Sequence, residues 1–140
     1  MQNETKNSDG FKITAVCSLV YFASYFSRKD FAAALAGMIT SGALDKTTGG
    51  LIGTALFICY GIGQLVFGYL ADRIKPWILL VTGLALSGVT NALMPLVPDT
   101  SFMIPLWAVN GFAQAMLWPP IVRMLADKLD SEKFVKANLY

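Results

Sequence analysis

The sequence predicts an all-α integral membrane protein, from its composition, the spacing of its charges and the length of its apolar segments. Of its 140 residues, 55% are hydrophobic and only 14% are charged, whereas an ordinary soluble domain carries roughly 25% charged residues. The mean hydropathy of +0.55 agrees with this. In lipid only helices and closed barrels satisfy every backbone polar group, and the sequence lacks the ~10-residue alternating segments of a barrel.

Composition also excludes several classes of function. Histidine is absent, which removes histidine acid–base catalysis and histidine metal ligands. The two cysteines, Cys17 and Cys59, lie inside apolar segments, which argues against a redox pair or a disulfide scaffold. A net charge of +2 is too small to suggest nucleic-acid binding. We therefore expect no enzyme, no cofactor, no metal site and no nucleic-acid partner.

Four segments nearly free of charge, 13–44, 47–71, 76–98 and 100–122, predict membrane-spanning helices. Each is longer than the about 20 apolar residues that cross a bilayer. With their flanking turns, they predict four helices, at 11–43, 49–73, 76–96 and 101–128. Residues 1–10 are polar and predict a frayed cytoplasmic tail. Residues 129–140 predict a cytoplasmic loop leading to a missing fifth helix, so we expect the chain to be a fragment.

The connections between these segments carry ordinary helix-end signals. Gly42 suits the end of the first helix, and Pro76 suits the first position of the third. Asp99 offers an N-cap to the fourth helix. Within that helix Pro119 and Pro120 predict a bend, because proline lacks a backbone donor.

The distribution of lysine and arginine predicts the orientation. Basic residues near helix ends accumulate on the cytoplasmic side. The two termini and the second connection together hold eight of them, whereas the other side holds only Lys46. Both termini are therefore expected in the cytoplasm, on the side marked by Lys6, Lys12, Arg73, Lys75, Arg123, Lys128, Lys133 and Lys136.

The most informative feature is the charged run Arg28-Lys29-Asp30 inside the first apolar segment. With the helix starting near residue 13, Arg28 lies ~22 Å along it, within a ~30 Å hydrocarbon core. Each such charge costs about 2.5–3.5 kcal/mol on the insertion scale, against about −0.5 kcal/mol for each large aliphatic or Phe residue. Charges of this kind usually face a cavity and serve a function. The alternative is a shorter helix ending near residue 27, with the charges snorkelling at the outer interface.

Helical spacing places Tyr21, Tyr25, Arg28 and Ala32 on one stripe. Two phenols beside a guanidinium form a donor-rich wall, and a guanidinium fork matches the oxygens of carboxylate and phosphate. Lys29 lies about 100° away and is expected to reach the edge of the same cavity.

Two further kinds of helix face have packing interpretations. One face of the fourth helix is either a cavity wall or interhelical hydrogen-bonding glue, and it carries Trp107, Asn110, Gln114 and Trp118. Small residues on one side of the second and third helices predict close helix packing, at Gly49, Gly53, Gly61, Gly83, Ser87 and Asn91.

Three segments, in this order and at these separations, resemble one transporter family. They are Tyr21-x-x-x-Tyr25-x-x-Arg28-Lys29-x-Phe31, Gly68-x-x-x-Asp72-Arg73-x-x-Pro76 and Gly111-x-x-Gln114-x-Met116-x-Trp118-Pro119-Pro120-x-x-Arg123. The second segment is similar to the loop motif of the major facilitator superfamily. The first and third resemble its organophosphate:phosphate antiporter branch, which includes glycerol-3-phosphate and hexose-phosphate transporters.

The resemblance implies the first four transmembrane helices of an N-terminal six-helix bundle, in a carrier of two such halves. It implies a small anionic substrate, a phosphate ester or related organic anion, bound between the halves and completed by an arginine of the half not present here. We expect the substrate-binding residues to be Arg28, Tyr21, Tyr25, Lys29 and Gln64. Gln64 departs from the family, which commonly places a lysine there, so the exact substrate is open.

The resemblance also implies a conformational latch at the cytoplasmic ends of helices two and four. Asp72 and Arg123 lie at these ends, with Arg73 beside them. Alternatively, they are independent charges at the interface.

Three hypotheses about the function follow. The first is part of an alternating-access carrier in the cell membrane, most readily the bacterial inner membrane, in contact with the lipid bilayer and the missing remainder of the transporter. The second is a transporter-derived phosphate-ester sensor or other non-transporting membrane subunit. The third is a complete four-helix exporter acting as a dimer, which usually carries a glutamate in its first helix; no Glu lies between Glu4 and Glu132.

Overall fold

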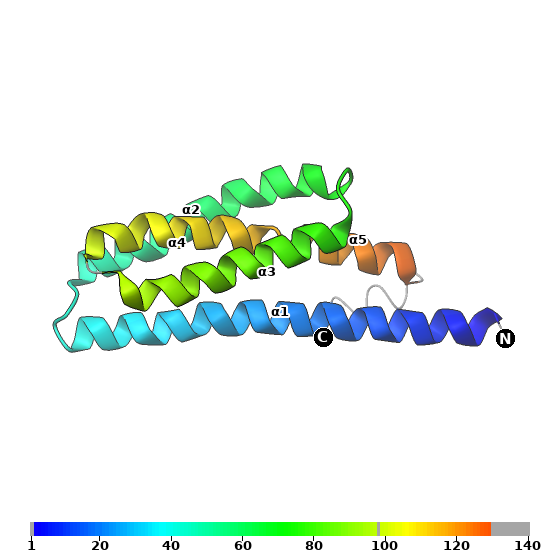
Figure 1. The fold of residues 1–140 in the computed structure, drawn as a ribbon, viewed down its shortest axis with the longest axis horizontal. Coiled ribbons are helices and arrows are strands. Elements are labelled where there is room, and N and C mark those ends of the chain that lie inside the picture. The colour runs from blue at the N-terminus through cyan, green and yellow to red at the C-terminus, as the bar shows by residue number, and fades with distance from the viewer. Residues whose placement is uncertain (1, 98, 130–140) are drawn as a thin grey trace.

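The computed structural model describes residues 2–97 and 99–129, and the regular elements within these ranges are all helices. The helices run back and forth along the long axis of the molecule (Figure 1). Their bounds are α1 Gln2–Thr40, α2 Lys46–Ala71, α3 Pro76–Leu93, the 3-10 turn η1 Met94–Leu96, α4 Thr100–Ala115 and α5 Trp118–Lys128. The expected all-α class is confirmed.

The ends of the chain differ from the sequence expectation in one respect. Residues 2–10, expected as a frayed tail, form the first turns of α1. No proline interrupts the chain between Gln2 and Thr40, so the backbone hydrogen bonds of the helix continue through the polar residues. Residues 130–140, where we expected the loop toward a fifth helix, lie outside the described residues.

Two residues with helix-end roles form the turn between α1 and α2. Gly42 has a φ of +75°, the left-handed conformation with which glycine commonly ends a helix. Asp45 then caps α2, because its Oδ1 accepts hydrogen bonds from the backbone N–H of Thr47 at 2.8 Å and of Thr48 at 2.9 Å. These bonds satisfy donors that the first turn of a helix leaves free.

The prolines of the fourth apolar segment divide it into α4 and α5. The helix is interrupted at Met116 and Leu117, whose N–H groups bond to carbonyls only three residues back. Pro119 has no N–H to offer the carbonyl four residues before it, which is that of Ala115. The expected bend is therefore present, and it leaves one carbonyl of α4 without its helical donor.

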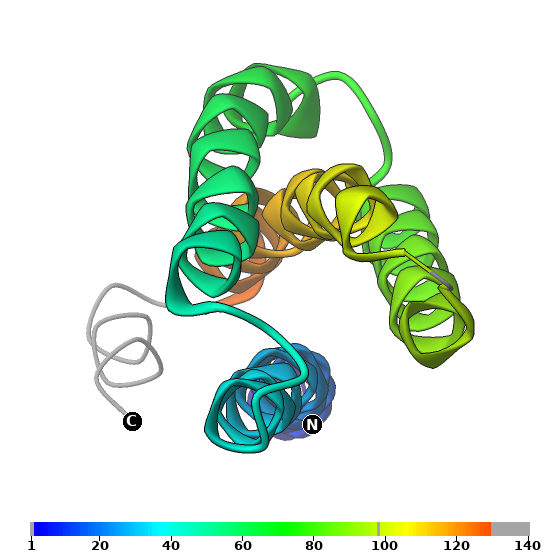
Figure 2. The same ribbon diagram turned by 90° about the vertical axis from the view of Figure 1, so that its left-hand side faces the viewer.

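Glycines set how closely the helices approach. Seen along the bundle, α4 lies between α2 and α3, and α1 stands apart from these three (Figure 2). A methyl group added at Gly83 would lie 2.8 Å from the carbonyl oxygen of Ala113, and one at Gly63 would lie 2.5 Å from the Cβ of Ala115. Gly111 meets the backbone of Leu56 directly. Small residues thus bring α2 and α3 against the backbone of α4.

The small-residue faces expected from the sequence are only partly packed. Gly83 lies against α4, and Gly49 lies against Ile39. Gly53 and Gly61, by contrast, have nothing within 4 Å of a Cβ added to them. In the described part of the chain, this side of α2 is therefore packed at Gly49 and open at Gly53 and Gly61.

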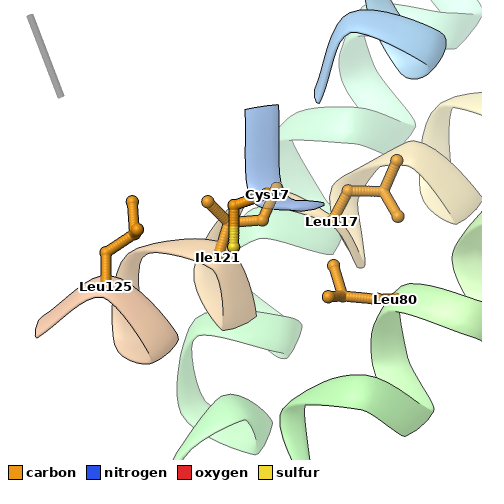
Figure 3. Close-up of a cluster of buried hydrophobic side chains, with 5 residues drawn as sticks. All are labelled: Cys17, Leu80, Leu117, Ile121 and Leu125. Carbon is orange, nitrogen blue, oxygen red and sulfur yellow. The ribbon is translucent and has the colours of Figure 1, made fainter. Parts of the chain in front are cut away.

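α1 joins the other helices through a buried apolar cluster at one end of the molecule. Cys17 of α1 meets residues of α3, of the break and of α5 (Figure 3). Burial of these side chains is the apolar contribution that holds α1 to α5. The cluster comprises Cys17, Leu80, Leu117, Ile121 and Leu125.

Large apolar side chains also cover the outside of the bundle. Leu65 is 80% exposed, Leu96 74% and Phe22 68%. Two helical stretches, Lys46–Ala71 and Pro76–Leu96, are long and apolar enough by length and composition to cross a membrane. α1 carries three charges within its apolar part, and the break shortens α4 to 16 residues, so neither forms an unbroken apolar span.

Candidate anion-binding site

Arg28 of α1 turns toward the other helices and not away from them. Its Nε donates a hydrogen bond to Oε1 of Gln114 on α4 at 2.7 Å. The carbon Cζ of its guanidinium lies 4.8 Å from the centre of the Tyr60 ring on α2, a cation–π distance. Arg28 is half-buried. The charge that the sequence placed within the first apolar segment therefore has partners on two neighbouring helices.

The two tyrosines of the predicted stripe lie together beside Arg28. The Tyr21 and Tyr25 rings stack with centres 6.2 Å apart, and Tyr21 also meets the Trp118 ring at 5.4 Å. The Nζ of Lys29 lies 5.3 Å from the centre of the Tyr25 ring. Tyr21 and Tyr25 are each 47% exposed. The structure thus forms a continuous row of aromatic rings with a lysine at one end.

Gln64 has a role that the sequence did not suggest. Its Nε2 donates to the carbonyl oxygen of Ala115 at 3.5 Å, the carbonyl that Pro119 leaves without a helical donor. Because buried carbonyls need a partner, this contact supplies the donor that the Ala115 carbonyl lacks at the break between α4 and α5. Gln64 lies one helical turn from Tyr60 on the same face of α2.

Behind Arg28, a buried polar network joins α4 to α3. The Nε2 of Gln114 lies 3.3 Å from Oδ1 of Asn110 and 3.5 Å from Oγ of Ser87. Ser87 donates to the same Oδ1 at 2.7 Å. Gln114 is 1% exposed and Asn110 0%. The polar face of α4 therefore makes hydrogen bonds to α3, and its Gln114 also accepts a hydrogen bond from Arg28.

Two residues of this site were missed as partners of Arg28. Gln114 was expected only on a polar face of the fourth helix, and the i, i+4 spacing of Asn110 and Gln114 was its signal. Tyr60 was not singled out, although it lies four residues before Gln64 on the second helix. Which side chain of one helix meets Arg28 depends on how helices are rotated about their axes, which helical spacing alone does not supply.

The predicted latch residues gather at the other end of α2. Arg123 of α5 donates through Nη1 to the carbonyl oxygens of Ala71, the last residue of α2, and of Ile74 in the connection to α3. Its Nε lies 3.8 Å from Oδ2 of Asp127. Asp72 is the C-cap residue of α2 and is exposed. Arg123 therefore reaches the end of α2 but pairs with Asp127 in this conformation.

Arg73, the third residue assigned to the latch, lies over a neighbouring ring. Its Cζ is 3.7 Å from the centre of the Tyr69 ring, one helical turn earlier. No ion pair joins Asp72 to Arg123 or Arg73 among the side chains that the structure describes. A latch between Asp72 and Arg123 remains a prediction for another conformation.

Comparison with known proteins identifies the family. The model of the Major Facilitator Superfamily matches residues 17–138. A probable hexose phosphate transport protein of Chlamydia muridarum is 35% identical over 75% of this chain and 23% of its own length. The glycerol-3-phosphate transporter of Haemophilus influenzae is 38% identical over 75% of this chain and 23% of its length.

A third relative is named as a sensor and not as a transporter. The membrane sensor protein UhpC of Salmonella typhimurium is 35% identical over 76% of this chain and 24% of its own length. The chain thus spans about a quarter of the length of these relatives. No solved structure matches the chain. The chain belongs to the Major Facilitator Superfamily, in the branch of the organophosphate:phosphate antiporters.

Proposed function

We propose that this chain forms the first four transmembrane helices of an alternating-access carrier that exchanges phosphate esters for phosphate. The observation that carries the proposal is Arg28, a cation within an apolar helix whose guanidinium is held by Gln114 and Tyr60. Placing such a charge in a membrane is costly, and such residues generally mark a substrate pathway. Relatives named for hexose phosphate and glycerol-3-phosphate transport support an anionic substrate.

In this proposal each site residue has a separate task. Arg28 binds the phosphoryl oxygens, because a guanidinium fork matches them geometrically. The exposed rings of Tyr21 and Tyr25 line the path of the organic part of the substrate, and Lys29 adds positive charge at its edge. Gln64 borders the site as a neutral hydrogen-bonding group. A partner arginine from the other half of the carrier completes the site, as the family resemblance implies.

We further propose that both termini are cytoplasmic and that the protein resides in the cell membrane, in bacteria the inner membrane. The excess of lysine and arginine near the two termini and the α2–α3 connection supports this orientation. Single cysteines placed at residues 9 and 46, in a background without Cys17 and Cys59, test it with a membrane-impermeant thiol reagent. In intact cells the cysteine at 46 should be labelled and that at 9 should not. The reverse pattern refutes the orientation.

Exchange itself is tested with the product of the complete reading frame that contains residues 1–140. The purified protein is reconstituted into liposomes loaded with phosphate, and uptake of labelled phosphate, glycerol 3-phosphate and glucose 6-phosphate is measured. We expect uptake that requires internal phosphate and disappears in Arg28→Met. Uptake that is independent of Arg28 would contradict the proposed site, and absence of uptake for all three would contradict exchange.

A sensor of phosphate esters is the second candidate, because the relative named as a membrane sensor protein shares the same 35% identity with this chain as the hexose phosphate transport protein does. The two functions separate in one comparison. A sensor binds the phosphate ester in detergent, with loss of binding in Arg28→Met, yet shows no uptake in the same liposomes. A carrier shows both binding and uptake.

A further inference from the structure

Arg28 is fixed on two sides, which leaves one defined edge for an anion. A guanidinium presents either its Nε side or its end, formed by Nη1 and Nη2, to an oxyanion. In this structure the Nε is occupied by Gln114 at 2.7 Å, and one face lies over the Tyr60 ring. Among the residues that the structure describes, none accepts a hydrogen bond from Nη1 or Nη2 of Arg28. We propose that Gln114 and Tyr60 are positioning residues that make Arg28 bind the anion end-on, through Nη1 and Nη2.

The direction of every hydrogen bond behind Arg28 supports this assignment. An arginine can only donate, so Gln114 must turn its Oε1 toward Arg28 and its Nε2 toward α3 and Asn110. The acceptors there are Oδ1 of Asn110 at 3.3 Å and Oγ of Ser87 at 3.5 Å. Ser87 donates to the same Oδ1. The guanidinium thereby determines the orientation of two buried amides in succession.

This arrangement also determines the surroundings of the amide nitrogen Nδ2 of Asn110. With Oδ1 of Asn110 turned toward Gln114 and Ser87, its Nδ2 is fully buried and has no hydrogen-bond partner among the residues that the structure describes. Buried polar groups in native proteins are nearly always paired, and exceptions of this kind gather where function constrains the structure. Rotating the Asn110 amide would give Nδ2 a partner but would face Gln114 with a second donor. The unpaired nitrogen is thus a consequence of holding Oε1 of Gln114 against Arg28.

The inference rests on the proposed anion site, so its test measures both. We titrate inorganic phosphate into the protein encoded by the complete reading frame, in three variants: Gln114→Met, Arg28→Lys and the double variant. Methionine keeps the volume of Gln114 but offers no comparable acceptor to Nε. We expect Gln114→Met to weaken phosphate binding about tenfold and to add no further loss in the Arg28→Lys background, because lysine has no Nε to be held.

A matched control separates positioning from general stability. Thr90 of α3 is also a buried polar residue, 2% exposed, but its hydroxyl bonds only to carbonyls of its own helix. Thr90→Val should leave phosphate binding unchanged. Tyr60→Leu removes the ring face under the guanidinium and should bind phosphate several-fold more weakly than the wild type.

The end of the Arg28 guanidinium that binds phosphate is identified by nitrogen NMR of 15N-arginine-labelled protein. The Arg28 signals are assigned by their loss in Arg28→Lys. Phosphate should shift the Nη resonances and leave the Nε resonance in place. A shift of Nε in place of Nη refutes end-on binding.

The outcomes distinguish the two levels of the proposal. If the wild type binds no phosphate, or binds it equally well in Arg28→Met, the proposed anion site fails. If binding depends on Arg28 but Gln114→Met has no effect, or weakens binding equally in the Arg28→Lys background, the anion site stands and the positioning role of Gln114 is refuted.

Discussion

Replacing Gly111 with alanine should force apart the two helices that pack most closely in this bundle. A Cβ at Gly111 would meet the carbonyl of Leu56, and the carbonyl carbon and Cα of Leu56 would lie only 3.0 Å away. Carbon atoms prefer separations of about 3.5–4.0 Å. The nearest atoms are backbone, which cannot rotate away as a flexible side chain can. α2 and α4 must therefore separate by roughly 0.5–1 Å.

Gly61→Ala provides the matched control for this perturbation. Gly61 lies in the middle of α2, and nothing lies within 4 Å of a Cβ added there. Both substitutions share the helix-propensity gain of about 1 kcal/mol that alanine has over glycine. Overpacking of a close contact typically costs about 1–3 kcal/mol. Gly111→Ala should accordingly be about 1–3 kcal/mol less stable than Gly61→Ala.

The measurement is thermal unfolding in detergent, followed with a thiol-reactive fluorophore. With Cys59 replaced by serine in both variants, labelling of Cys17, which is 2% exposed within the cluster that joins α1 to α5, reports loss of packing. We expect the unfolding midpoint of Gly111→Ala to lie roughly 3–10 °C below that of Gly61→Ala. An equal or higher midpoint would mean that α2 and α4 do not approach at Leu56 as described.

Three further predictions concern the site and the ends of the helices. Arg28→Lys should weaken phosphate binding about 10–100-fold, because a lysine retains the charge but loses a bidentate, charge-assisted contact; isothermal titration measures this, and unchanged affinity would contradict it. Asp72→Asn should change the ratio of the two access states, measured by distance distributions between spin labels, while expression stays near wild type. If Arg123→Gln shows the same ratio as the wild type, a latch between Asp72 and Arg123 is excluded. Hydrogen bonds from the Thr48 hydroxyl and backbone hold the pKa of the exposed Asp45 carboxyl below its ordinary value of 3.8. Because the folded pKa is lowered, the stabilisation by this cap is present above pH 3.8 and lost as the pH falls through the lower folded pKa. Thermal unfolding over that range should show a larger loss in wild type than in Asp45→Asn, which keeps a capping oxygen without a titrating charge.

The sequence alone determined the helical class, two of the residues at helix ends and the presence of a costly charge. Apolar segments of spanning length leave the backbone few alternatives in lipid. Gly42 and Asp99 act through their own backbone and the next few residues, so their roles at helix ends can be predicted from the local sequence. The stripe of Tyr21, Tyr25 and Arg28 follows from the 3.6-residue period of one helix.

The tertiary structure decided what these residues meet. Gln114 and Tyr60 became partners of Arg28 only once α4 and α2 had set rotations about their own axes, which depend on the close contacts at Gly63 and Gly111. For the same reason Gln64 faces a carbonyl freed by a proline 55 residues later in the chain, and Arg123 reaches the end of α2. Local periodicity fixes which residues share a face, whereas packing between helices distant in sequence decides which face each one meets.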